Sequence, residues 1–199
     1  MNNSWEPLTA QAWYYSMTSL ADAYWLQADF NMEGFSAGAQ YTSIDSATSG
    51  EPDDEAYAVM LGYEIADVVS LSAAYSKVDD EGTFGVANVA TRGTNAGAQS
   101  KLYTEMWWWY GSVSTTGAQS YTIAAETTVG DGYDLYLGYW NVDVNPALAQ
   151  DWTVDEVAFT VSKSYGPLDT SVAVIFDDFG GTDESGDLTT YQVYLTYNF

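Results

Sequence analysis

The feature that most constrains this sequence is a one-by-one alternation of apolar and polar residues. In the last nine residues, YQVYLTYNF (191–199), the odd positions are Tyr, Val, Leu, Tyr and Phe, and the even positions are Gln, Tyr, Thr and Asn. Because successive side chains of a β-strand point to opposite faces, the segment has one apolar and one mostly polar face. Such a strand fits a soluble sheet with a buried face, and also a membrane barrel whose apolar face meets lipid.

The alternation recurs throughout the chain and predicts an all-β fold. We predict ten strands, at about 8–18, 22–32, 35–44, 55–65, 68–78, 119–129, 133–142, 152–164, 168–178 and 191–199. One face of each strand is apolar, and the other is small or polar, which makes a dry core on that second face difficult to build. We therefore predict an antiparallel transmembrane β-barrel with its apolar face outward. The less favoured alternative is a soluble sheet with cross-strand Tyr pairs.

Aromatic spacing and loop lengths support the barrel. Aromatic residues lie six apart on the apolar face in several strands, for example Tyr57 and Tyr63, as expected for two interfacial aromatic girdles. Short connections such as NMEGFS (31–36) alternate with long ones, of which the longest spans about 79–118. Bacterial outer-membrane barrels have short periplasmic turns and long external loops. We therefore treat 1–199 as one barrel segment with a long external loop at about 79–118.

The stretch KLYTEMWWWYGSVS (101–114) does not alternate, and an additional strand there would break the order of short and long connections. Two interpretations of Trp107, Trp108 and Trp109 remain open. We favour packing of the long loop onto the barrel rim. In the other interpretation the loop folds into the lumen and narrows it, and a buried Trp would then need a partner for its N–H group.

Composition excludes several functions. The chain has 28 Asp and Glu against 4 Lys and Arg, a net charge of −24, which disfavours nucleic acid as a partner. It has no Cys and no His, so disulfides, thiolate or His metal sites and Ser-His-Asp catalysis are excluded. A carboxylate hydrolase lacks any placed nucleophile, so we do not expect an enzyme. No apolar run is long enough for a membrane helix, and MNNSWEP lacks the features of a signal peptide.

The positions of the predicted strands that point inward include several acidic residues and no basic residue. The candidate lumen-lining residues are Asp29, Glu64, Glu126, Asp134, Glu156 and Asp169. Rings of Asp and Glu concentrate and favour cations, so we expect a diffusion pore that prefers cations. Asp29, Glu126 and Glu156 are the strongest candidates because they lie mid-strand. The alternative for any one of them is a solvated acid, or one hydrogen-bonded to a loop.

Runs of acids also occur in the predicted external loops. Asp53, Asp54 and Glu55 in EPDDE (51–55) are a candidate Ca²⁺ site, because Ca²⁺ takes oxygen ligands. The spacing is not that of an EF-hand loop, and a solvated loop surface is the favoured interpretation. We expect no other cofactor.

Short phrases along the chain resemble one porin family. GFSAGAQYTSID (34–45), MLGYEIADVVSLSAAYSKVDDEG (60–82) and the terminal aromatic strand resemble the C-terminal half of the major outer membrane porins of Campylobacter-like (epsilonproteobacterial) bacteria. The resemblance implies a trimeric barrel in the bacterial outer membrane, surrounded by lipid, that passes small hydrophilic solutes and cations. This chain departs from the family in length, since the N-terminal half of that barrel has no counterpart here.

The shorter length matters because about eight strands give a barrel filled by side chains, whereas aqueous channels appear at 16–18. Inward aromatic residues such as Trp25, Tyr136 and Trp140 would narrow a ten-stranded lumen further. Three arrangements remain open: a further segment completes a wider barrel, ten strands close alone with little conductance, or several chains share one wall. The alternative function is a non-conducting surface barrel, an adhesin or structural anchor, that displays acidic loops.

Overall fold

The structure, a computed structural model, describes residues 2–5, 7–48, 50, 52–82, 85–87, 99–144, 152–181 and 186–199. In these residues the chain forms one antiparallel sheet in which every strand pairs with its neighbours in sequence. The strands are β1 (Asn2–Trp5), β2 (Leu8–Met17), β3 (Ala21–Met32), β4 (Phe35–Ser46), β5 (Asp54–Ile65), β6 (Val69–Val78), β7 (Ala118–Val129), β8 (Tyr133–Val144), β9 (Trp152–Tyr165), β10 (Leu168–Gly181) and β11 (Leu188–Tyr197).

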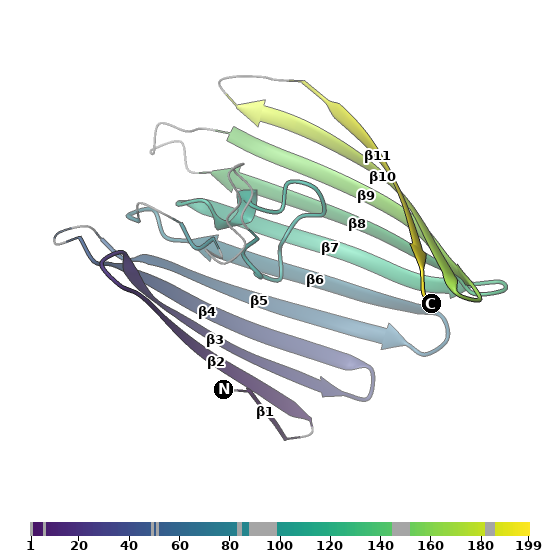
Figure 1. The fold of residues 1–199 in the computed structure, drawn as a ribbon, viewed down its shortest axis with the longest axis horizontal. Helices are drawn as coiled ribbons and strands as arrows, with labels where there is room; N and C mark the ends of the chain where they lie inside the picture. Colours follow the sequence, from purple (N-terminus) through teal and green to yellow (C-terminus); the bar gives the residue numbers. More distant parts are fainter. Residues whose placement is uncertain are drawn as a thin grey trace.

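The sheet is curved into an open trough (Figure 1). Strands β2–β11 are the ten predicted strands, and the all-β antiparallel prediction is confirmed. The short strand β1 was not predicted; it pairs with the first residues of β2, from Leu8 to Gln11. Within the described residues β1 and β11 are the two edges, each paired with a single neighbour.

Connections of two kinds lie at opposite ends of the trough. Tight turns at 33–34, 66–68, 130–132 and 166–167 form one end, here called the tight-turn end. The turn between β3 and β4 uses Gly34 at φ +82°, a conformation that glycine adopts without a Cβ penalty, and the Gly34 carbonyl accepts a hydrogen bond from Glu64 N at 2.8 Å. The long connections lie at the other end, the long-loop end. The predicted alternation of short and long connections is therefore confirmed.

The convex face of the sheet is apolar and uncovered. On β5 the outward residues Tyr57, Val59, Leu61, Tyr63 and Ile65 are 44–59% exposed. The outward positions of β11 are 62–73% exposed. A continuous apolar face of this extent in a soluble protein would be covered by a second layer or a partner. In the described part of the chain, no helix is long and apolar enough to cross a membrane.

The concave face carries the long connection between β6 and β7, whose described residues are 79–82, 85–87 and 99–117. Leu102, Met106 and Val113 of this connection are buried against inward residues of the strands. The strand residues in this core are Ala56, Ala58, Val78, Ala118, Trp140, Val142, Val144, Val154, Ala158 and Ile175. Our expectation that the inward face could not form a dry core is wrong for the half near the long loops. The reason is that small Ala and Val side chains leave room there for the loop.

Candidate functional site

As predicted, the described residues of the connection between β6 and β7 do not form a strand. Among the described residues of this connection, the one helical turn is a 3₁₀ turn at Ser112–Ser114. It crosses the concave face, and polar contacts hold its first part to β3 and β4. The Tyr103 hydroxyl donates to Asp29 Oδ1, Tyr103 N donates to Gln40 Oε1 at 3.0 Å, and Gln40 Nε2 donates to the Lys101 carbonyl at 3.2 Å.

Burial and the hydrogen bond to Asp29 both raise the pKa of the Tyr103 hydroxyl, so it stays protonated and acts as the donor. Burial also raises the pKa of Glu105, although its carboxylate accepts hydrogen bonds from Ser100 N at 3.1 Å and Lys101 N at 2.9 Å. These bonds fix the turn at the start of the crossing, so that Tyr103 is presented to Asp29.

Glu156 on β9 holds the centre of the crossing. Its carboxylate accepts three consecutive backbone N–H groups, from Trp107 at 2.6 Å, Trp108 at 2.9 Å and Trp109 at 3.1 Å. Successive N–H groups that converge in this way form a cavity for a negative charge. Glu156 is 0% exposed, so its side chain faces inward as predicted but does not border open space. Its register partner on β10, Asp177, is also buried, which places two carboxyl groups side by side beneath the loop.

The side chains of Trp107 and Trp109 extend the contact across β8, β10 and β11. The Trp107 ring lies 5.6 Å from the Tyr136 ring, and its Nε1 donates to Gln192 Oε1 at 3.3 Å. The Trp109 ring packs edge-on against Phe179 at 5.0 Å. We favoured packing of these residues on the barrel rim, and the structure instead places them on the concave wall. No periodic pattern in residues 101–114 indicates this position.

Asp54 on β5 fixes both ends of the crossing. Its Oδ1 accepts Gly85 N at 2.7 Å and the Thr116 hydroxyl at 3.4 Å, and the residue is 1% exposed. Glu55 points to the opposite face and accepts the Tyr41 hydroxyl, while Asp53 is exposed in the preceding loop. The three acids of the candidate Ca²⁺ site therefore do not converge. Among the described residues, no group of three or more acids is placed to hold a metal ion.

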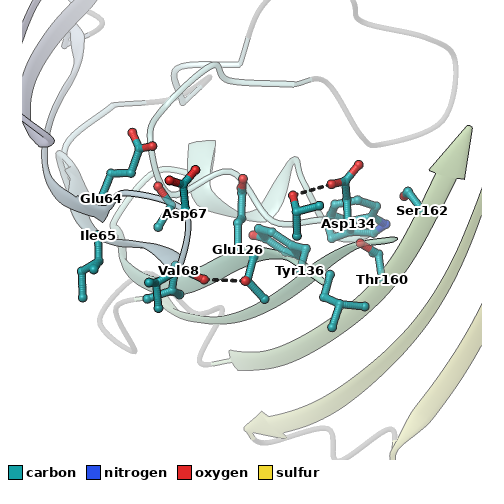
Figure 2. A pocket seen from close by; sticks show the side chains of 15 residues that line it. Glu64, Ile65, Asp67, Val68, Glu126, Asp134, Tyr136, Thr160 and Ser162 are labelled. Carbon is teal, nitrogen blue, oxygen red and sulfur yellow. Dashed lines mark hydrogen bonds between the residues drawn. The ribbon is translucent and has the colours of Figure 1, made fainter. Parts of the chain in front are cut away.

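Below the loop, at the tight-turn end, the concave face contains a cavity of about 820 Å³. Glu64, Glu126 and Asp134 line it, and Asp67 from the turn between β5 and β6 joins them. Figure 2 shows these four carboxylates directed to the same side of the sheet, while Ile65 points away from them. No Lys or Arg is among its described lining residues, and Trp107 of the loop borders it.

The six predicted lining acids thus divide into three groups. Glu64, Glu126 and Asp134 share the cavity, and Asp29 and Glu156 hold the loop. Asp169 lies apart near the tight-turn end, where it accepts hydrogen bonds from the Ser164 hydroxyl at 2.5 Å and Asn198 Nδ2 at 2.8 Å. Our strand-based reasoning missed Asp67 because it lies in a turn. The short connection EIADVV (64–69), which brings this turn beside Glu64, was the signal available.

Comparison with known proteins identifies the fold. No protein-family model matches the sequence, and no curated protein is significantly similar to it. Solved bacterial porins do share its structure. OpdQ of Pseudomonas aeruginosa superimposes with a TM-score of 0.75 at 14% identity, over 98% of this chain and 53% of that one. OprD of the same organism gives 0.70 at 15% identity, over 96% and 57% of the two chains.

The anion-selective porin from Comamonas acidovorans also matches, with a TM-score of 0.63 at 13% identity, over 99% of this chain and 57% of the porin. The predicted fold class is therefore confirmed: the sheet is the antiparallel wall of a porin-type β-barrel. This chain spans little more than half the length of these porins, and its sheet is not closed.

Proposed function

We propose that this chain forms part of the wall of a diffusion porin in the bacterial outer membrane. The observation that carries the proposal is the opposite chemistry of the two faces of one sheet. The convex face exposes apolar residues that lipid would cover, and the concave face combines an acidic cavity with a loop that folds inward. The long-loop end would face outside the cell, and the tight-turn end the periplasm.

The loop would be the constriction of the pore. Residues 99–117 cross the concave face from Asp29 on β3 to Gln192 on β11, and hydrogen bonds fix them at both sides. Solutes would pass the loop before they reach the acidic cavity. A loop fixed in this way limits the size of solute and brings the solute close to charged groups.

Charge supports a preference for cations. Glu64, Asp67, Glu126 and Asp134 raise the local concentration of positive ions in a low-dielectric channel. Lys77 and Lys163 occupy outward positions on β6 and β9. The fold does not decide selectivity, because a porin described as anion-selective shares it. We therefore base the preference on the acids of this chain.

The two edges of the sheet call for further strands. In lipid, unpaired N–H and C=O groups of an edge cannot be satisfied by water, so a spanning sheet has to close. We propose that strands from polypeptide outside this sequence, or from further copies of it, pair with β1 and β11. The resemblance to Campylobacter-type porins supports the first source and a homotrimer of complete barrels.

The test is the reversal potential across a KCl gradient in planar bilayers that contain the closed barrel, meaning this chain together with the strands that pair with β1 and β11. We expect cation preference, and we expect a triple variant Glu64→Gln, Glu126→Gln, Asp134→Asn to reduce it. The matched control is Glu55→Gln, which removes an acid from the outward face. Anion preference in the unmodified protein would contradict the cation proposal. Absence of any channel would contradict the porin proposal and favour a non-conducting surface barrel.

A further inference from the structure

A second pocket on the concave face is lined by aromatic residues. It lies at the long-loop end of β2–β4 and has a volume of about 120 Å³. Trp13, Tyr15 and Trp25 line it, and the strand register places Trp13 directly opposite Trp25. Trp13 is 42% exposed and Tyr15 48%, although both face inward. The acidic cavity does not include any of these three residues.

The polar groups of this pocket differ in how they are held. Gln27 is fixed: its Oε1 accepts Gln40 Nε2 at 3.2 Å and Trp25 Nε1 at 3.4 Å, and its Nε2 donates to Asp29 at 2.8 Å. Within the described part of the chain, the Gln11 amide, the Trp13 indole N–H and the Tyr15 hydroxyl make no side-chain hydrogen bond. The pocket therefore presents aromatic faces together with donors and acceptors that a ligand can use.

The charges around the pocket restrict the class of ligand. Lys101 is the one charged residue among its described lining residues, and no carboxylate lines it. A cationic ligand would meet the Lys101 ammonium group in a pocket that no carboxylate lines. An anionic ligand would have to enter a protein of net charge −24. A neutral ligand with several hydroxyl groups avoids both costs.

We propose that this pocket is a binding subsite for neutral sugars. The apolar C–H faces of a pyranose ring would stack on Trp13, Tyr15 and Trp25, and its hydroxyl groups would bond to the Gln11 amide. The inference deepens the proposed porin function, on which it rests. The pocket lies at the long-loop end, on the side of the loop away from the acidic cavity, so it would capture a sugar before the constriction.

The experiment is isothermal titration calorimetry of the detergent-solubilised full chain with maltotriose. We expect binding, and we expect Trp13→Ala and Tyr15→Ala each to weaken it by about tenfold or more, because each removes a stacking ring. Trp13→Phe keeps an aromatic ring and should retain most of the affinity. The matched control is Tyr194→Ala, an inward residue of β11 with 50% exposure that lies outside the pocket.

Several results would overturn the sugar site. One is the absence of any heat of binding with maltotriose, and another is an equal maltotriose affinity in Trp13→Ala and the unmodified protein. The others are a loss of affinity in Tyr194→Ala as large as that in Trp13→Ala, and tighter binding of putrescine than of maltotriose. Circular dichroism of each variant identifies any variant that fails to fold. If an Ala variant does not fold, the affinity of Trp13→Phe for maltotriose still tests the site, because this variant keeps an aromatic ring.

Failure of this inference can be told apart from failure of the porin function. A protein that conducts ions but does not bind maltotriose keeps the pore and loses the sugar site. A protein that binds maltotriose in the calorimeter but forms no channel keeps the site and loses the pore.

Discussion

Replacement of Glu156 by Gln should release the loop from the concave wall. The carboxylate accepts three backbone N–H groups, two on Oε2 and one on Oε1. A Gln side chain offers one carbonyl oxygen, and its NH₂ group would face at least one of the remaining N–H donors. At best, Gln keeps the bonds to Trp108 and Trp109 as neutral hydrogen bonds, and its NH₂ group lies against Trp107 N.

The magnitude follows from the count of hydrogen bonds. Three bonds to a charged acceptor contribute about 1.5–3 kcal/mol each, and the two that remain to a neutral acceptor contribute about 0.5–1.5 kcal/mol each. The gross loss is about 3–6 kcal/mol. Part of it is recovered because a charge next to buried Asp177 is removed. We therefore expect the loop to be destabilised by about 2–4 kcal/mol.

Hydrogen–deuterium exchange of the Trp107–Trp109 amides measures this change directly. A destabilisation of that size should raise their exchange rates by about 30- to 1,000-fold. The matched control is Glu126→Gln, since Glu126 is an exposed acid of the cavity that does not hold the loop. Unchanged protection of the three amides in Glu156→Gln, or an equal increase in Glu126→Gln, would refute the role of Glu156.

Two further predictions concern the wall. Ile123 lies on the convex face of β7 at 59% exposure, and Ile123→Arg should lower the free energy of unfolding by about 2–4 kcal/mol, measured by guanidinium unfolding from lipid vesicles. The control Gln119→Arg, closer to the long-loop end, should lower it clearly less. Equal losses would contradict lipid contact at Ile123. Gly34→Ala should lower the free energy of unfolding more than Gly130→Ala does. Both glycines have a positive φ, so the two variants share the backbone strain. A Cβ at position 34 would also lie 2.7 Å from the Glu64 carbonyl oxygen, whereas a Cβ at position 130 meets nothing within 4 Å. The reverse order would show that this contact does not decide the cost.

The strands were predictable because one physical requirement acts on all of them. A wall between lipid and water needs opposite chemistry at successive residues, so parity identified the outward face of β5 and β11 without tertiary information. The four-residue strand β1 (Asn2–Trp5) was not predicted, since NNSW is too short to show alternation. It forms through its pairing with β2, which local sequence does not report.

The functional residues were only partly predictable, because parity fixes the direction of a side chain and not what covers it. Glu126 and Glu156 have the same inward parity and were interpreted in the same way. In the structure, Glu126 borders the cavity and Glu156 is covered by the Trp107–Trp109 backbone. The difference depends on where a non-periodic loop lies, and contacts between distant parts of the chain determine that.

The position of the loop does have a physical origin in the strands, in a change of inward residue type along their length. On β5 the inward positions run from Ala56 and Ala58 near the long loops to Gly62 and Glu64 near the tight turns. On β8 they run from Val142 and Trp140 to Asp134 in the same direction. The apolar part is covered by the loop, and the polar part stays open to the cavity. The loop lies where it buries Leu102 and Met106, and its three N–H groups partner the buried carboxylate of Glu156. Asp177 next to Glu156 is buried as well. The wall therefore sets the depth at which the loop lies in the trough, and the Glu156 hydrogen bonds hold the loop at that depth.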